Sequence, residues 1–111
     1  MRPSVIVKFD MDGFHYYPNA PQEVRFLQNP HRHTFAITAA FRVTDLNREI
    51  EIFIMRNKMM QFLAGQYGNP CHFGSMSCEM IAAVLVEKYM DYGLDYVEVW
   101  EEATGGARIE L

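Results

Sequence analysis

Apolar residues that alternate with polar ones place one face of a strand against a core. The first half of the chain shows this alternation in three segments, which we predict to be strands: 5–11, 34–43 and 50–54. Two further strands are predicted near the C-terminus, over residues 96–101 and 107–111, with Gly105-Gly106 as the turn between them. The pattern therefore predicts strands at both ends of the chain.

Between these strands the apolar spacing changes to that of an amphipathic helix. One helix is predicted over residues 56–66, where Gly65 and Gly68 terminate it. A second helix is predicted over 77–90. The residues expected to face inward are Met59, Met60, Phe62 and Leu63 in the first helix and Ile81, Val84, Leu85 and Tyr89 in the second.

The remaining segments are predicted to be loops and turns. The stretch 17–30 contains three prolines and is expected to be loop with a short turn around 23–27, while 45–47 is a turn and 68–75 a loop with Pro70. No segment has the composition of a linker, so residues 1–111 are expected to form one domain. Strands clustered around paired helices indicate an α+β fold with an antiparallel sheet.

Composition narrows the functional classes. Half of the residues are hydrophobic, which argues against disorder, and the net charge of -4 argues against general nucleic-acid binding. No apolar run is long enough to span a membrane, and the N-terminus lacks a signal-peptide pattern. The two cysteines, Cys71 and Cys78, form no disulfide framework. We therefore expect a cytoplasmic protein that binds neither membrane nor nucleic acid.

The histidines are the residues most suggestive of chemistry. His31 and His33 would point to the same face of a strand, and His15 could add a third imidazole from another strand. Three histidine ligands leave the fourth position of a tetrahedral zinc ion open for substrate. The alternative is that these are surface or core histidines with ordinary hydrogen bonds.

Four segments together resemble a known family. They are Met11-Asp12-Gly13-Phe14-His15, His31-Arg32-His33-Thr34-Phe35, Ser77-Cys78-Glu79, and Val97-Glu98-Val99-Trp100-Glu101 followed by Thr104 and Gly106. Their order and distances resemble those of the tunnelling-fold enzymes related to 6-pyruvoyltetrahydropterin synthase and 6-carboxytetrahydropterin synthase. Arg32 stands where that family has a glycine between the two histidines.

The resemblance implies a fold and a set of site residues. The implied fold is an antiparallel four-stranded sheet with two helices on one face, which associates into a barrel as a trimer or hexamer. The implied site holds Zn²⁺ on His15, His31 and His33, and Glu101 anchors the ring of a reduced pterin such as dihydroneopterin triphosphate. Glu79 either helps to hold the substrate or only favours the helix macrodipole.

The departures from the family concern proton transfer. The family usually has a catalytic cysteine four residues before the histidine pair, where this chain has Leu27. Its histidine–aspartate pair is matched only by His72, since the aspartate is missing, and either Cys71 or Cys78 could supply a thiol from another direction. His72 and Cys71 are the candidate catalytic residues. Two hypotheses follow: a zinc-dependent pterin lyase or synthase, and a non-catalytic protein that binds a purine-like or pterin-like ligand.

Overall fold

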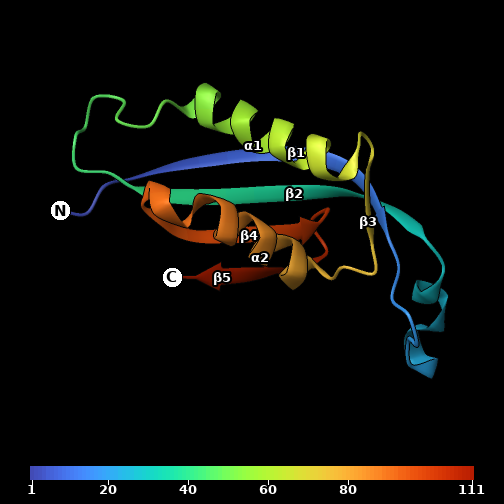
Figure 1. The fold of residues 1–111 in the computed structure, drawn as a ribbon. Helices are drawn as coiled ribbons and strands as arrows, with labels where there is room; N and C mark the ends of the chain where they lie inside the picture. The colour runs from blue at the N-terminus through green and yellow to red at the C-terminus, as the bar shows by residue number, and fades with distance from the viewer.

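The protein has an α+β fold in which two α-helices cover one sheet (Figure 1). The computed structural model describes residues 1–111. In chain order the elements are β1 (Ser4–His15), the 3-10 helix η1 (Gln22–Gln28), β2 (His31–Arg42), α1 (Ile52–Tyr67), β3 (Cys71–Gly74), α2 (Cys78–Tyr89), the 3-10 helix η2 (Met90–Tyr92), β4 (Leu94–Glu101) and β5 (Gly105–Glu110). The predicted fold class is confirmed.

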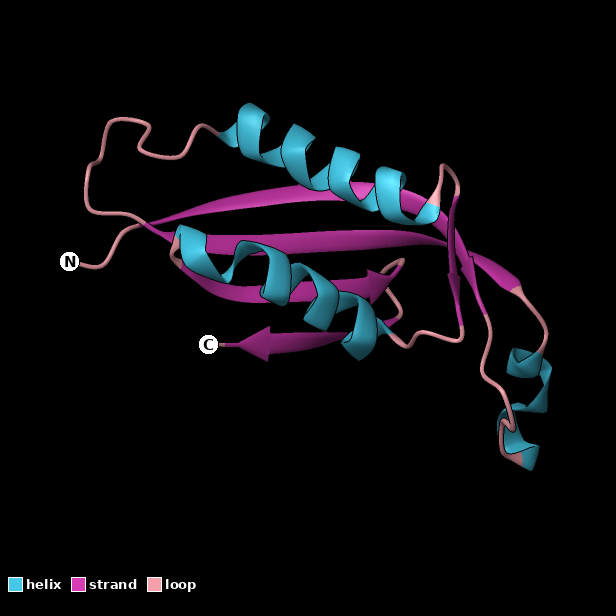
Figure 2. Cartoon of the chain, in the orientation of Figure 1, coloured by secondary structure: helices cyan, strands magenta, loops and turns pink.

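The sheet has five strands in the order β3-β1-β2-β4-β5. All neighbouring strands are antiparallel except β1 and β3, which run parallel. The expected sheet of four antiparallel strands is therefore wrong in strand number and in the direction of one pair. The parallel pair arises because the chain crosses over the sheet through α1 before it returns as β3 (Figure 2).

One face of the sheet carries the core. Along most of β1 and β2 the odd-numbered residues are buried, and they alternate with exposed or half-buried even-numbered ones. Val7 pairs with Ala39 on the buried face. Helix α1 packs against β1, and α2 packs against β4 and β5, so both helices cover this same face. The core is closed by buried side chains of the two helices: Met55, Met59, Leu63, Ile81, Ala82, Leu85 and Tyr89.

The strand predicted over 50–54 is wrong. Helix α1 already begins at Ile52, because the Glu51 carboxylate accepts hydrogen bonds from the Phe53 and Ile54 N–H groups at 2.9 and 3.0 Å. The alternating isoleucines are not the inner face of a strand, since Ile52 and Ile54 are exposed. The cap and the downstream helical spacing override the β-propensity of this segment.

The loop predicted over 68–75 contains a strand, which is a second correction. Residues Cys71–Gly74 form β3, and buried Cys71 and Phe73 alternate with the exposed His72. Four residues are too few for a periodic signal, so the strand exists through its pairing with β1.

The predicted turn at Gly105-Gly106 is wrong, because both glycines lie in β5 and the turn is formed by residues 102–104. The other elements agree with the expectations to within a few residues. Strand β2 begins at His31, three residues earlier than predicted, so both histidines of the pair lie in the strand. The second helix begins after Ser77, whose hydroxyl accepts the Met80 N–H at 3.2 Å. The predicted turn at 23–27 lies within η1, at the tip of an arm that extends beyond the helices (Figure 1).

Candidate metal centre

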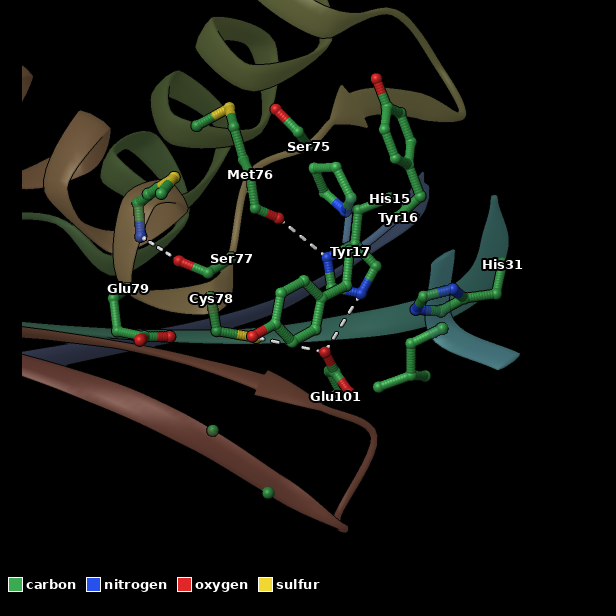
Figure 3. A pocket seen from close by; sticks show the side chains of 15 residues that line it. His15, Tyr16, Tyr17, His31, Ser75, Met76, Ser77, Cys78, Glu79 and Glu101 are labelled. Carbon is green, nitrogen blue, oxygen red and sulfur yellow. Dashed lines mark hydrogen bonds and ion pairs between the residues drawn. The ribbon is translucent and has the colours of Figure 1, made fainter. Parts of the chain in front are cut away.

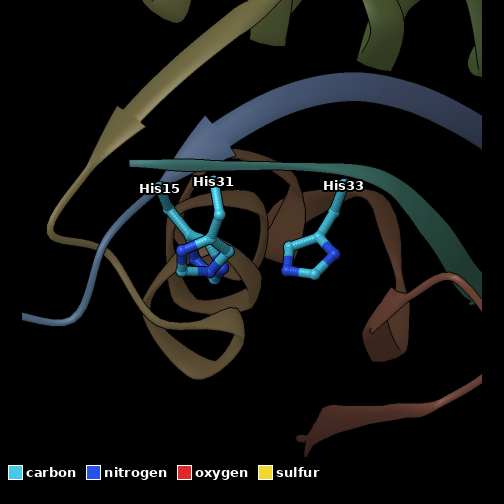
Figure 4. Close-up of side chains that lie close together, drawn as sticks. All are labelled: His15, His31 and His33. Atoms are coloured by element: carbon cyan, nitrogen blue, oxygen red, sulfur yellow. The ribbon is translucent and has the colours of Figure 1, made fainter. Parts of the chain in front are cut away.

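Strand pairing brings the three predicted histidines together. In the antiparallel pair of β1 and β2, His15 lies directly opposite His31, and Gly13 lies opposite His33. The three side chains project from two adjacent strands to the same side of the sheet (Figure 4). The predicted common face of the histidines is confirmed.

This cluster continues the core face past the last apolar layer. The Phe35 ring lies edge-on to the rings of His15 and His33, with ring centroids 5.1 and 5.7 Å away. A Cβ on Gly13 would lie 2.9 Å from the Phe73 ring and 3.1 Å from the Phe35 ring. Glycine at this position therefore lets the aromatic side chains pack directly beneath the histidines.

The three imidazoles offer converging ligand atoms. One nitrogen from each of His15, His31 and His33 lies within 4.8 Å of the other two. Each Nδ1 lies 2.9 Å from an oxygen acceptor; these acceptors are the Met76 carbonyl, the Asn29 carbonyl and the Glu102 carboxylate, respectively. A carbonyl or an ionised carboxylate has no proton to give, so Nδ1 must donate and the neutral ring keeps its lone pair on Nε2.

This hydrogen-bond pattern is the one that metal-binding histidines use. An oxygen acceptor on one ring nitrogen fixes the tautomer and orients the other nitrogen toward the metal. The Nε2 atoms of His15 and His33 are buried and have no hydrogen-bond partner, which is unusual for a polar atom in a folded protein. Burial also lowers the pKa of His15 and thereby favours the neutral ring, although the Met76 carbonyl and Glu101 act in the opposite direction. The cluster could therefore hold a metal ion.

A cavity of about 680 Å³ opens beside this cluster (Figure 3). Two of the histidines form part of its wall, together with the start of α2 and the end of β4. The lining residues are His15, Tyr16, Tyr17, Pro18, Leu27, His31, Ser75, Met76, Ser77, Cys78, Glu79, Met80, Glu101, Gly105 and Gly106. Both carboxylates predicted for substrate binding, Glu101 and Glu79, line this cavity.

Two consecutive glutamates approach the same histidine. Glu101 ends β4 opposite Phe35, on the core face, and its Oε1 lies 3.4 Å from His33 Nε2. Glu102 follows directly, and its φ of 51° takes it out of the strand. Its carboxylate therefore turns back to accept from His33 Nδ1 and from the Thr34 N–H. The Thr34 N–H and His33 lower the pKa of Glu102.

The cavity also contains a thiol. Cys78 lies at the start of α2, and its Sγ donates to Glu101 Oε2 at 3.7 Å. Burial, with Glu101 as the second cause, raises the pKa of this thiol to about 12. Cys78 is therefore protonated at neutral pH, despite its place at a helix N-terminus.

The two residues predicted to be catalytic do not line the cavity. Cys71 is fully buried in the core, and burial raises the pKa of its thiol to about 11. His72 is exposed and stacks on Phe14, which alternates with the core-facing residues of β1. Leu27 does line the cavity, so the position of the missing cysteine is near the site.

The residues that the sequence did not identify are Glu102 and the backbone acceptors of the histidines. No alternation signals them, because Asn29 precedes a strand, Met76 lies between two elements and Glu102 is in a turn. Cys78, by contrast, was expected from the sequence as a possible thiol, and it does line the cavity.

Comparison with known proteins gives a fold likeness. No protein-family model and no curated protein matched the sequence. The structure is similar to the crystal structure of an uncharacterized protein from Wolinella succinogenes, with a TM-score of 0.70 over 99% of this chain and 98% of that chain. The sequence identity is 12%, so the likeness concerns the fold alone. No helix of the structure has the length and apolar character needed to cross a membrane.

Proposed function

We propose that this chain is a zinc-dependent enzyme, similar to 6-pyruvoyl- and 6-carboxytetrahydropterin synthases, that acts on a reduced pterin such as dihydroneopterin triphosphate. The observation that carries the proposal is the set of three imidazoles whose Nδ1 atoms are all bound to oxygen acceptors beside a cavity with two carboxylates. Three nitrogen ligands of one type suit zinc, and three protein ligands are typical of a catalytic site.

Each part of the cavity has a counterpart in a pterin. The ring presents adjacent N–H groups, which a carboxylate such as Glu101 or Glu79 can accept as a pair. A zinc ion on the three histidines would polarise the oxygens of the substrate's side chain and so assist proton transfer. Tyr16 and Tyr17 add aromatic surface at the cavity wall for the flat ring.

The proton-transfer group of the proposed enzyme is the Cys78–Glu101 pair. The thiol is the only cysteine in the cavity and is hydrogen-bonded to Glu101, whose Oε2 also lies 3.1 Å from His15 Nε2. With its pKa raised to about 12, the Cys78 thiol stays protonated at neutral pH and is too weak an acid to give up its proton readily. The thiol would therefore hold the Glu101 carboxylate through its hydrogen bond, and Glu101, which also contacts His15, would be the group that accepts and returns a proton.

The second candidate function is ligand binding without turnover. It is favoured by Leu27, which lines the cavity where the family has a catalytic cysteine, and by the absence of His72 and Cys71 from the cavity lining. In that case the same cavity would recognise a purine-like or pterin-like ring.

One experiment separates the two functions. The purified protein is incubated with dihydroneopterin triphosphate and the products are analysed with and without a metal chelator. The enzyme hypothesis expects conversion that the chelator abolishes and that zinc restores. Tight binding with no conversion in any sample would overturn it in favour of the binding protein.

The proposed fold is that of a tunnelling-fold subunit, which implies a homo-oligomer. Strands β3 and β5 are the two edges of the sheet, and both helices cover only one of its faces. Unpaired edges and an uncovered face can be closed by pairing copies into a barrel. Light scattering coupled to size-exclusion chromatography should give the mass of a trimer or hexamer; a monomer at all concentrations would contradict the barrel.

A further inference from the structure

Glu101 lines the cavity and also contacts the histidine cluster. Its Oε2 is 3.1 Å from His15 Nε2 (Figure 3), and its Oε1 is 3.4 Å from His33 Nε2. One carboxylate thus contacts the proposed metal-binding nitrogens of two histidines at once. It reaches them because Val99 and Glu101 share the face of β4 on which the core and the histidines lie.

The contacts of Glu101 with His15 and His33 place hydrogen-bond acceptors opposite one another. The Nδ1 atoms of His15 and His33 are both committed to oxygen acceptors, so their Nε2 atoms carry lone pairs that face the carboxylate. The distances alone would suit an ion pair with a protonated ring, but neither Nε2 has a hydrogen-bond partner. Lone pairs at such distances repel each other unless a cation lies between them.

The distances are those between neighbouring ligands of one ion. Zinc binds imidazole nitrogen at about 2.0–2.1 Å and carboxylate oxygen at about 2.0–2.2 Å, which places adjacent ligands of a tetrahedron roughly 3.3 Å apart. The two contacts of Glu101, at 3.1 and 3.4 Å, lie on either side of that value. Glu79 and Glu102 have no such contact with any Nε2 atom, since Glu102 bonds the Nδ1 side of His33.

The geometry points to Glu101 as a fourth metal ligand, so that three histidines and one glutamate surround the ion when no substrate is bound. This inference rests on the proposed metal centre and changes its number of protein ligands from three to four. The Cys78 thiol then serves to hold the ligating carboxylate in place, as hydrogen-bond donors to such carboxylates do. Glu79 is left as the cavity carboxylate that is free to accept the paired N–H groups of a ring.

The test compares metal binding by Glu101→Gln and Glu79→Gln, two isosteric changes in the same cavity. Zinc affinity is measured by competition with a chromophoric chelator, and the visible spectrum is recorded after cobalt loading. We expect Glu101→Gln to lower the zinc affinity by at least about tenfold, because even the loss of a residue that only supports a metal ligand typically has an effect of that size. The cobalt spectrum should also change in Glu101→Gln, whereas Glu79→Gln should behave as the wild type in both measurements.

The outcomes separate this inference from the proposed function. Wild-type zinc affinity and cobalt spectrum in Glu101→Gln, with metal lost in His31→Ala, would overturn the ligand role of Glu101 and leave the metal centre intact. Metal that stays bound in His31→Ala would overturn the metal centre itself. If Glu101→Gln does not fold, a crystal structure of the zinc-loaded wild type decides. A Glu101 oxygen at about 2.0–2.2 Å from the ion supports the inference, and a water in that position overturns it.

Discussion

The two ends of one sheet face differ in chemistry although the same strands build them. Beneath the helices, β1, β2 and β4 present fully buried apolar residues such as Val7, Ile37 and Val99. Past Phe35 the same face presents His33 and Glu101, and a cavity opens beside the histidine cluster. Core and site therefore adjoin directly: Phe35 is buried in the core, and His33, the preceding residue on the same face of β2, belongs to the site.

This difference shows how the fold supports a polar cluster. The apolar end supplies stability, while each imidazole at the polar end is held by a hydrogen bond from Nδ1. The two ends should therefore respond differently to substitution: the core through the free energy of unfolding, and the site through metal affinity. The experiments below test that separation.

The largest expected effect is on stability, from Phe35→Ala. Phe35 is fully buried at the boundary, and truncation of a buried phenylalanine costs about 3–5 kcal/mol. Urea denaturation of the metal-free protein measures this loss. As the matched control, His31→Ala should change the metal-free stability by only about 0.5 kcal/mol, as for substitutions away from a core. Equal losses in both variants would show that core and site are not separate.

Zinc should stabilise the wild type but not His31→Ala. An ion that binds only the folded state adds about 2.7 kcal/mol when its free concentration is 100 times the dissociation constant. Thermal unfolding with and without zinc measures this gain. A rise in melting temperature of the same size in His31→Ala would mean that the stabilising ion binds elsewhere.

Gly13→Ala tests the layer that joins the two ends. The added Cβ would lie 2.9–3.1 Å from the Phe73 ring, the Cys71 carbonyl oxygen and the Phe35 ring. Overpacking of this kind typically costs about 1–3 kcal/mol. Denaturant unfolding of the metal-free variant gives this cost. Unchanged stability would show that these rings can move aside.

Glu102→Ala should weaken zinc binding without unfolding the chain. Its carboxylate orients His33 from the Nδ1 side, but its side chain is 47% exposed, so we expect a loss of about tenfold, the lower end for such partners. The chelator competition assay measures the change. Wild-type affinity would show that the orientation of His33 does not depend on Glu102.

The smallest effect concerns the thiol of Cys78. Burial and Glu101 raise its pKa to about 12, so the reactive thiolate should keep increasing as the pH rises beyond the ordinary thiol value of 9.0. The rate of alkylation in a Cys71→Ser background should therefore still rise at pH 10. A rate that levels off near pH 9 would contradict the raised pKa.

Strands with strong alternation and helices with strong spacing could be predicted from the sequence. Two segments that were predicted wrongly depend on contacts that the apolar pattern does not show. Within 50–54 the Glu51 side chain caps a helix that begins at Ile52, and β3 forms through its pairing with β1. Neither a cap nor a parallel partner changes the local pattern of apolar residues. The edge strand β3 could therefore not be predicted, whereas the other edge strand, β5, could.

For the site, strand periodicity was sufficient to place the histidines. His31 and His33 share a face because side chains alternate in a strand, and the register adds His15 opposite His31. The position of Glu102 could not be predicted, because its positive φ interrupts that alternation. The cavity roles of His72 and Cys71 came from the family resemblance, and in this chain these residues lie outside the cavity lining.

The most direct test of the central claim is the metal content of the purified protein. Elemental analysis of the wild type should give about one zinc ion per chain, the stoichiometry of a single three-histidine centre. His31→Ala should contain none, and neither should the variant with alanine at His15, His31 and His33. Stoichiometric metal in that triple variant would contradict the metal centre proposed for this fold.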